Sequence, residues 1–163
     1  MRFLIVTLFL IIYIGITFGS SEVDSINQKI SDLKKCCKSK IIKHERSPRT
    51  KKINSDCLEE DYVKSAVDDK QLCQTYCINL KLGAYDPESG FNNTLYSTKM
   101  RTFIIKDADW KTDIDTNQIT ELCFKNLVPN LEKCSIEFLK SKYCFWKEIS
   151  KHCPQELRNS DFC

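Results

Sequence analysis

The chain is poor in the residues that several classes of fold and site require. It has 4 glycines and 4 prolines, and after residue 19 the only glycines are Gly83 and Gly90. So few glycines argue against a meander of short strands joined by tight turns. It has 2 histidines, His44 and His152, and no CxxC pair, which argues against the usual structural zinc sites. We therefore expect no metal site and no β-rich fold.

A strong charge excess and the common catalytic motifs are also missing. Lys and Arg total 25 against 22 for Asp and Glu, a formal net charge of +3, which argues against a nucleic-acid partner. Neither the G-x-S-x-G pattern nor a P-loop occurs. An even number of cysteines leaves no free thiol for a Cys–His nucleophile. We predict that the protein is not an enzyme and uses no cofactor.

The one long apolar run lies at the start of the chain. Arg2 precedes an apolar stretch from Phe3 to Phe18, and small residues at Thr17 and Gly19 suit cleavage before Ser20. A retained signal anchor is the alternative, but the run is shorter than the ~20 residues that a spanning helix needs. The sequence predicts a signal peptide over residues 1–19 and one secreted, extracellular domain over residues 20–163, not embedded in a membrane.

In a secreted protein, the cysteines and the single glycosylation sequon each predict a covalent modification. All 10 cysteines follow the signal segment, and an even number in a secreted chain predicts a disulfide framework, here of five bridges. The sequon Asn92-Asn93-Thr94 adjoins a predicted turn, so Asn92 is expected to carry a glycan.

The stretch from Leu72 to Gly90 predicts a helix around which the other cysteines are organised. Cys73 and Cys77 are four residues apart, which puts both sulfurs on one helix face. Their side chains run parallel and cannot easily bond each other, so each is expected to reach a different part of the chain. Gly83 is placed to end this helix, and residues 86–90 read as a tight turn.

Apolar periodicity predicts helices elsewhere, and we expect an all-α bundle of about six helices. The expected segments are residues 21–37, 59–67, 91–105, a helix capped by Thr116 and ended before Pro129, and a long last helix that Asn130 caps and Pro154 closes. Residues 38–54 are polar and basic, with Lys43, Arg46, Arg49, Lys51 and Lys52 around Ser47-Pro48, and we interpret them as a solvated loop.

Cys36 and Cys37 are expected to have different partners. Cys37 continues the apolar stripe of Val23, Ile26, Ile30 and Leu33, whereas Cys36 lies about 100° away from it. A bond between the two neighbours would require a strained peptide.

The cysteine pattern resembles that of insect odorant-binding proteins. A C-x3-C helix with Ile78, Lys81 and Leu82, followed by an Asp86-Pro87-Glu88 turn, resembles the second and third cysteines of that family. Cys134 and Cys144 enclose nine residues, Cys144 and Cys153 enclose eight, and Pro154 follows at once, which resembles the Plus-C branch. One departure is the short interval of ten residues between Cys123 and Cys134.

The resemblance implies an interlocked set of bridges. First-to-third, second-to-fifth and fourth-to-sixth pairing would give Cys37–Cys77, Cys73–Cys144 and Cys123–Cys153. Cys36 or Cys57 could replace Cys37 as the partner of Cys77. Cys36, Cys57, Cys134 and Cys163 would then form two further bridges in an open pairing.

The scaffold and the resemblance together lead us to expect a ligand-binding function. Many staples in a small helical domain suit a hollow core, since a cavity removes packing contacts. The resemblance implies a secreted carrier that solubilises odorants, pheromones or related small hydrophobic ligands in chemosensory fluid, with a membrane chemoreceptor as a further candidate partner. Tyr143 or Tyr85 could orient a ligand. The candidate lining residues are apolar positions on the later helices: Met100, Phe103, Ile104, Leu122, Leu127, Phe138, Leu139, Phe145, Trp146 and Ile149.

A second hypothesis belongs to another class. The same scaffold could serve as a venom, salivary or reproductive-fluid protein that acts by contacting another protein, with the basic segment from Lys38 to Lys52 as its contact surface. A carrier should tolerate charge reversal in that segment, whereas an interaction protein should lose its activity.

Overall fold

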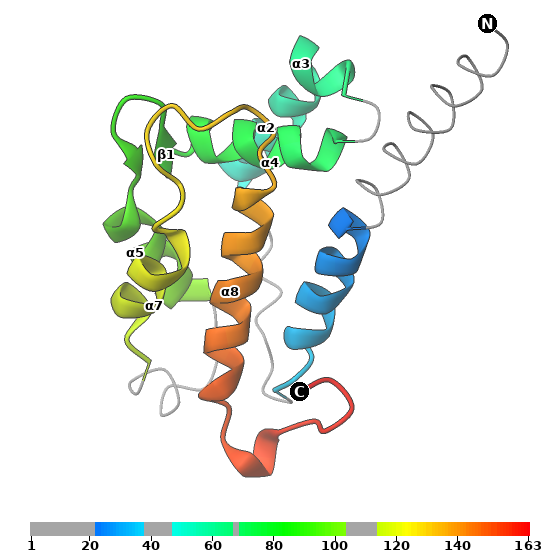
Figure 1. The fold of residues 1–163 in the computed structure, drawn as a ribbon, viewed down its shortest axis with the longest axis vertical. Helices are drawn as coiled ribbons and strands as arrows, with labels where there is room; N and C mark the ends of the chain where they lie inside the picture. Colours follow the sequence, from blue (N-terminus) through cyan, green and yellow to red (C-terminus); the bar gives the residue numbers. More distant parts are fainter. Residues whose placement is uncertain (1–21, 38–46, 67–68, 104–113) are drawn as a thin grey trace, which may run out of the picture.

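The structure, a computed structural model, describes residues 22–37, 47–66, 69–103 and 114–163 (Figure 1). Within these ranges it is a disulfide-stapled helical bundle, so the predicted all-α class is confirmed. The predicted signal peptide over residues 1–19, Ile104 and part of the basic segment lie outside the described residues.

A long central helix, α8 (Glu137–Lys151), organises the bundle. In Figure 1 a helix over residues 22–33 runs along one side of α8, and α5 (Asn93–Phe103) and α7 (Thr116–Phe124) lie on the other side. α4 (Lys70–Lys81) crosses near the start of α8, together with α2 (Pro48–Leu58) and α3 (Asp61–Lys64). A 3-10 turn, η1 (Gln155–Leu157), follows α8.

The main core lies where these helices meet α8. Val23, Ile26 and Ile30 are buried, so the stripe that predicted the first helix faces the core. A smaller second cluster joins α2, α3 and α4 through Ile53, Cys57, Val63, Cys73 and Cys77. The two clusters place the cysteine-bearing face of α4 against α2 and α3.

α2 corrects the prediction of a loop over residues 38–54. Ser47 Oγ accepts a hydrogen bond from the Thr50 amide, and Pro48 takes the first helical position, where its missing N–H costs nothing. Only Ile53 and Cys57 are buried on this helix. The apolar periodicity was too sparse to indicate it, although Ser-Pro is a helix-start pattern.

The turn after α4 follows the prediction. Gly83 has φ +69° beyond the end of α4, and β1 (Tyr85–Asp86) pairs antiparallel with β2 (Gly90–Phe91). Asp86 Oδ1 accepts hydrogen bonds from the amides of Glu88 and Ser89 and from the Ser89 hydroxyl. These hydrogen bonds stabilise the charged carboxylate and lower the pKa of Asp86 below its usual value. The Ser89 amide has the largest effect, and the Glu88 amide and the Ser89 hydroxyl add to it.

The last long helix starts later than predicted. Asn130 has φ +57° and Cys134 has φ +65°, so the backbone from 130 to 136 turns repeatedly before α8 begins at Glu137. Asn130 is therefore not the cap of α8. The α7 cap is Asp115 rather than Thr116, because the Asp115 carboxylate accepts from the amides of Asn117 and Gln118.

The five bridges differ from the pattern that the resemblance implies. The structure pairs Cys36–Cys163, Cys37–Cys153, Cys57–Cys77, Cys73–Cys134 and Cys123–Cys144. The expected Cys37–Cys77, Cys73–Cys144 and Cys123–Cys153 bridges are therefore corrected. The alternative partner Cys57 is the one that bonds Cys77, and Cys73 and Cys77 do reach two different segments, as their spacing predicted.

Helix packing explains the observed pairs. Cys37 follows the first helix and pairs with Arg158 in an antiparallel bridge, which puts it beside the C-terminal segment and not beside α4. Cys144 lies within α8, which packs against α7, and so meets Cys123. Cys134, in the turn before α8, is left to meet Cys73 on α4.

Candidate ligand pocket

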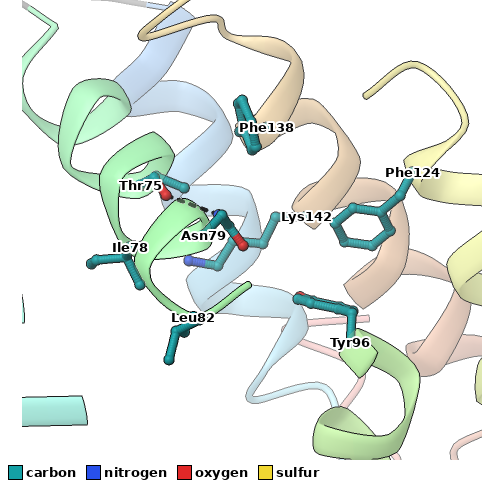
Figure 2. Close-up of a pocket in the computed structure, with 8 residues that line it drawn as sticks. All are labelled: Thr75, Ile78, Asn79, Leu82, Tyr96, Phe124, Phe138 and Lys142. Carbon is teal, nitrogen blue, oxygen red and sulfur yellow. Dashed lines mark hydrogen bonds between the residues drawn. The ribbon is translucent and has the colours of Figure 1, made fainter. Parts of the chain in front are cut away.

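A partly open pocket of about 230 Å³ lies where α4, α5, α7 and α8 meet (Figure 2). α4 and the residue after it supply Thr75, Ile78, Asn79 and Leu82. The other three helices supply Tyr96, Phe124, Phe138 and Lys142. Most of this lining is carbon, so the pocket suits an apolar molecule.

The spacing of the α4 residues explains why they face the pocket. Residues 75, 78, 79 and 82 are related by i, i+3, i+4 and i+7, which places them on one face of a helix. Cys73 and Cys77 lie on the opposite face of the same helix, since each residue advances the helix by about 100°. On one face, α4 is joined by disulfides to α2 and to the turn that contains Cys134. Its opposite face lines the pocket.

Packed aromatic rings form the wall on the α5 and α7 side. The Tyr96 ring centroid lies 4.6 Å from that of Phe124 and 5.6 Å from that of Phe145. Phe91 stacks on Phe124 at 4.4 Å. Offset and edge-on ring pairs are each favourable by about 0.5–1.5 kcal/mol beyond the burial of their area, so these rings support one another without a ligand. The wall is therefore preformed.

The remaining wall is also aromatic but leads into the main core. Phe138 packs edge-on against Tyr85 at 5.2 Å and against Tyr76 at 5.6 Å. The Tyr85 hydroxyl donates to the Val128 carbonyl and accepts from the Leu131 amide. Since both functions of that hydroxyl are occupied, Tyr85 does not offer the ligand contact suggested for it.

Polar groups interrupt the apolar lining at a few points. Asn79 Nδ2 donates to the Thr75 carbonyl at 2.8 Å, and the Thr75 hydroxyl donates to the Gln71 carbonyl at 2.8 Å. Burial raises the pKa of the Tyr96 hydroxyl, so this group stays protonated and neutral at physiological pH. Lys142 adds an aliphatic stem to the lining.

The structure places the predicted lining residues in several environments. Phe138 lines this pocket, whereas Leu127, Leu139, Phe145, Trp146 and Ile149 are buried in the main core and Met100 packs at its edge. Leu122 is 52% exposed on the surface, so it does not line an interior pocket. Ile104 and the side chain of Phe103 lie outside the described residues.

The lining residues that the sequence did not predict come mainly from α4 and the residue after it. Their signal was present as the i, i+3, i+4, i+7 set opposite the two cysteines, but it includes Thr75 and Asn79, which an apolar pattern search passes over. Tyr96, Phe124 and Lys142 were likewise not indicated.

The predicted glycosylation position is accessible. Asn92 and Thr94 are exposed, and Asn92 Oδ1 accepts from the Leu95 amide at the start of α5. A glycan would attach through Nδ2, which leaves this capping bond in place.

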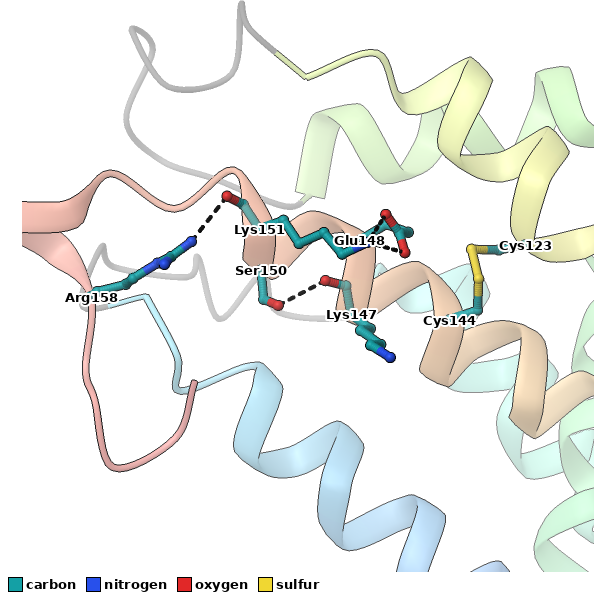
Figure 3. A network of polar contacts seen from close by, with 7 residues as sticks. All are labelled: Cys123, Cys144, Lys147, Glu148, Ser150, Lys151 and Arg158. Carbon is teal, nitrogen blue, oxygen red and sulfur yellow. Dashed lines mark hydrogen bonds and ion pairs between the residues drawn. A yellow bond between two sulfur atoms is a disulfide. The ribbon is translucent and has the colours of Figure 1, made fainter.

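A polar network at the far end of α8 is structural in character (Figure 3). Arg158 donates to the Lys151 carbonyl at 3.1 Å, and Lys151 pairs with Glu148 at 2.7 Å, while Ser150 donates to the Lys147 carbonyl. Arg158 thereby satisfies a carbonyl at the C-terminal end of α8 and joins it to the segment that carries Cys163.

The described residues show neither a metal-binding cluster nor a membrane-spanning helix. No group of three or more His, Cys, Asp and Glu side chains among them is arranged to hold a metal ion. Their helices are all too short or too polar to cross a bilayer. Among known proteins, no family model, curated sequence or solved structure matches this chain.

Proposed function

We propose that the protein binds a small, mainly apolar molecule in the pocket between α4, α5, α7 and α8 and carries it in an extracellular fluid. The observation that carries the proposal is the preformed aromatic lining of this pocket. Its volume of about 230 Å³ is below the roughly 300–1,000 Å³ typical of sites for drug-sized ligands. The ligand is therefore a compound smaller than a typical drug molecule.

The position of two disulfides supports this proposal. Cys73–Cys134 ties α4 to the turn before α8, and Cys123–Cys144 ties α7 to α8. These three helices carry most of the lining residues. Covalent ties between them oppose the collapse that a cavity invites, because the lining atoms lack contacts on one side.

The resemblance to odorant-binding proteins agrees with such a carrier role, but it is secondary. The bridges in this structure depart from the interlocked set that the resemblance implies. The proposal therefore depends on the pocket and its lining and does not require membership of that family.

The experiment is a titration of the oxidised, delipidated secreted protein with an apolar, environment-sensitive fluorophore, followed by apolar competitors. Saturable and displaceable micromolar binding is expected for the parent. Thr75→Trp should fill the pocket and reduce fluorophore affinity at least tenfold. Thr98→Trp is the matched control, because Thr98 is exposed on α5 and its hydroxyl also donates to the carbonyl four residues earlier at 2.8 Å.

Two results would count against the carrier. One is a folded, fully oxidised parent that binds neither fluorophore nor competitor. The other is equal loss of binding in the Thr75→Trp and Thr98→Trp proteins, since that would place the fluorophore outside this pocket.

A second candidate function is contact with an acidic partner protein through α2. Arg49, Lys51 and Lys52 are exposed in the first turns of this helix. Cations are unfavourable at the positive end of a helix dipole, so these residues are not explained by helix stability. The Arg46 position of the same segment lies outside the described residues.

Charge reversal separates the two functions. The triple variant Arg49→Glu, Lys51→Glu, Lys52→Glu should keep fluorophore affinity within about twofold if the protein is a carrier. Under the contact hypothesis, labelled parent protein sediments as a larger complex in its native fluid and the triple variant does not, which analytical ultracentrifugation would detect.

A further inference from the structure

The Tyr96 hydroxyl is a polar group of the pocket wall, on a partly buried side chain, and has no evident structural task. Its ring is fixed by Phe91, Phe124 and Phe145, and Figure 2 shows its oxygen turned towards the space that the lining residues enclose. No residue that the structure describes forms a hydrogen bond with this hydroxyl. The Tyr85 hydroxyl, by contrast, donates to one backbone group and accepts from another. A ligand that fills the pocket would displace water from this hydroxyl, so a ligand group that can pair with it is favoured over one that cannot.

Asn79 presents a complementary group from the facing helix. Its Nδ2 donates to the Thr75 carbonyl, which fixes the amide and leaves Oδ1 on the pocket side, as Figure 2 shows. Within the described part of the chain, Oδ1 receives no hydrogen bond. An amide oxygen only accepts, whereas a phenol hydroxyl can donate or accept.

From these two groups we infer that the pocket recognises a hydroxyl, and that its ligands are small apolar alcohols. The ligand hydroxyl donates its proton to Asn79 Oδ1 and accepts the proton of the Tyr96 hydroxyl, while Phe124, Phe138 and Ile78 enclose its carbon part. This inference rests on the proposed carrier function and names the chemical class of the cargo.

Other ligand classes fit the two groups less well. A hydrocarbon would displace water from both oxygens and offer neither of them a hydrogen-bond partner. An ether accepts from Tyr96 but cannot donate to Asn79. A carboxylate also lacks a proton to donate and places negative charge against Asn79 Oδ1. An anionic ligand would have to depend on Lys142, and the test below includes that outcome.

Four probes of similar size separate these classes. Benzyl alcohol, anisole and ethylbenzene share the same number of non-hydrogen atoms and differ in their ability to donate and accept, and benzoate adds a negative charge. Each is titrated into the isotopically labelled, oxidised protein, and affinity is read from backbone amide chemical shifts in NMR spectra. The shifts also report whether residues 75–82 and 96 are the ones that respond.

The variants give a different pattern for each probe. Tyr96→Phe removes only the hydroxyl and should weaken benzyl alcohol and anisole about three- to tenfold, the usual worth of a net hydrogen bond. Asn79→Leu should weaken benzyl alcohol alone. Ethylbenzene should bind both variants at least as well as the parent. Tyr143→Phe is the matched control, because Tyr143 lies on α8 outside the pocket lining, and it should change nothing.

The outcomes distinguish the inference from the carrier function beneath it. If no probe binds the parent, both fail. If probes bind at these residues but Tyr96→Phe and Asn79→Leu weaken all of them equally or not at all, the carrier function stands and the hydroxyl recognition is wrong. Benzoate binding more tightly than benzyl alcohol would also overturn it and would assign the polar contact to Lys142.

Discussion

Tyr85 shows at the scale of a single residue how the core accommodates a polar atom. It is 1% exposed, and its hydroxyl links the Val128 carbonyl at 3.0 Å to the Leu131 amide at 2.9 Å. Its ring packs against Tyr76 and Phe138. One side chain therefore anchors the segment between α7 and α8 to the hairpin after α4.

Removal of the Tyr85 hydroxyl should lower the stability of the protein. Tyr85→Phe leaves a buried carbonyl and a buried amide without their partner, and we expect a loss of about 1–3 kcal/mol in the free energy of unfolding. Urea denaturation of the oxidised protein measures it. Tyr143→Phe, at a partly exposed position, should cost less than about 0.5 kcal/mol. Equal losses for the two variants would contradict this role for Tyr85.

Individual residues were predictable where their environment depends only on neighbours along the chain. The separate partners of Cys36 and Cys37, and of Cys73 and Cys77, followed from helix angles, and the structure confirms both. The lining role of Tyr96 did not follow. It depends on α5 meeting α4 and α7, and nothing in the local sequence distinguishes Tyr96 from Tyr85 or Tyr143.

At the scale of elements, the hairpin β1–β2 is held closely against the segment before α8. The Phe91 amide donates to the Leu127 carbonyl, and the Asn130 amide donates to the Pro87 carbonyl. Gly90 has φ +84°, and a Cβ there would lie 3.1 Å from the Leu127 carbonyl oxygen and 3.2 Å from Pro129 Cδ. Gly90 is thus required both for its conformation and for its lack of a side chain.

Two alanine substitutions separate these requirements. Gly83→Ala meets the same conformational penalty at φ +69°, but its Cβ would have Leu95 Cδ2 as its nearest contact, at 3.8 Å. We expect Gly83→Ala to cost about 1–2 kcal/mol and Gly90→Ala to cost at least about 1 kcal/mol more, because backbone atoms must move. Thermal unfolding of both variants checks the order, and a lower melting temperature for Gly83→Ala would refute it.

Elements with a continuous apolar stripe or clear end signals were predictable from the sequence. The helices over residues 22–33 and 70–81, the turn at 86–90 and α5 lie close to where they were expected. α2 was missed because it buries only Ile53 and Cys57. The start of α8 was placed too early because the left-handed backbone at Asn130 and Cys134 is imposed by tertiary contacts and a bridge.

At the scale of the whole molecule, two nested bridges join the first helix to the C-terminal segment. Cys37–Cys153 spans 116 residues and lies inside Cys36–Cys163, which spans 127. The spacings were visible in the sequence, but the pairing depends on which helix ends meet in space. The family resemblance implied Cys37 as the partner of Cys77, whereas in the structure Cys37 lies beside Arg158 of the C-terminal segment.

The nesting predicts that the two bridges are not energetically independent. Once either has formed, the other closes a ring of only 11 residues, the difference between 127 and 116. Replacing either pair by alanine should then cost about 3 kcal/mol, whereas replacing both pairs should cost clearly more than twice that, because the long loop opens.

Urea denaturation of the two double variants and the quadruple variant measures this coupling, after peptide mapping without reduction has established the parent's pairs. Cys57→Ala with Cys77→Ala serves as the reference, since its bridge spans 20 residues and closes its own loop. Additive losses for the nested pair, within about 0.5 kcal/mol, would contradict the nesting.

The nested bridges also make the chain between Cys36 and Cys163 a closed covalent ring. One proteolytic cut at any peptide bond inside that ring opens it without releasing a fragment. A nicked molecule would keep all of its residues linked until it is reduced, and the bridges at α4, α7 and α8 would remain in place. A first proteolytic cut would therefore leave both halves of the chain covalently joined, and only reduction would separate them.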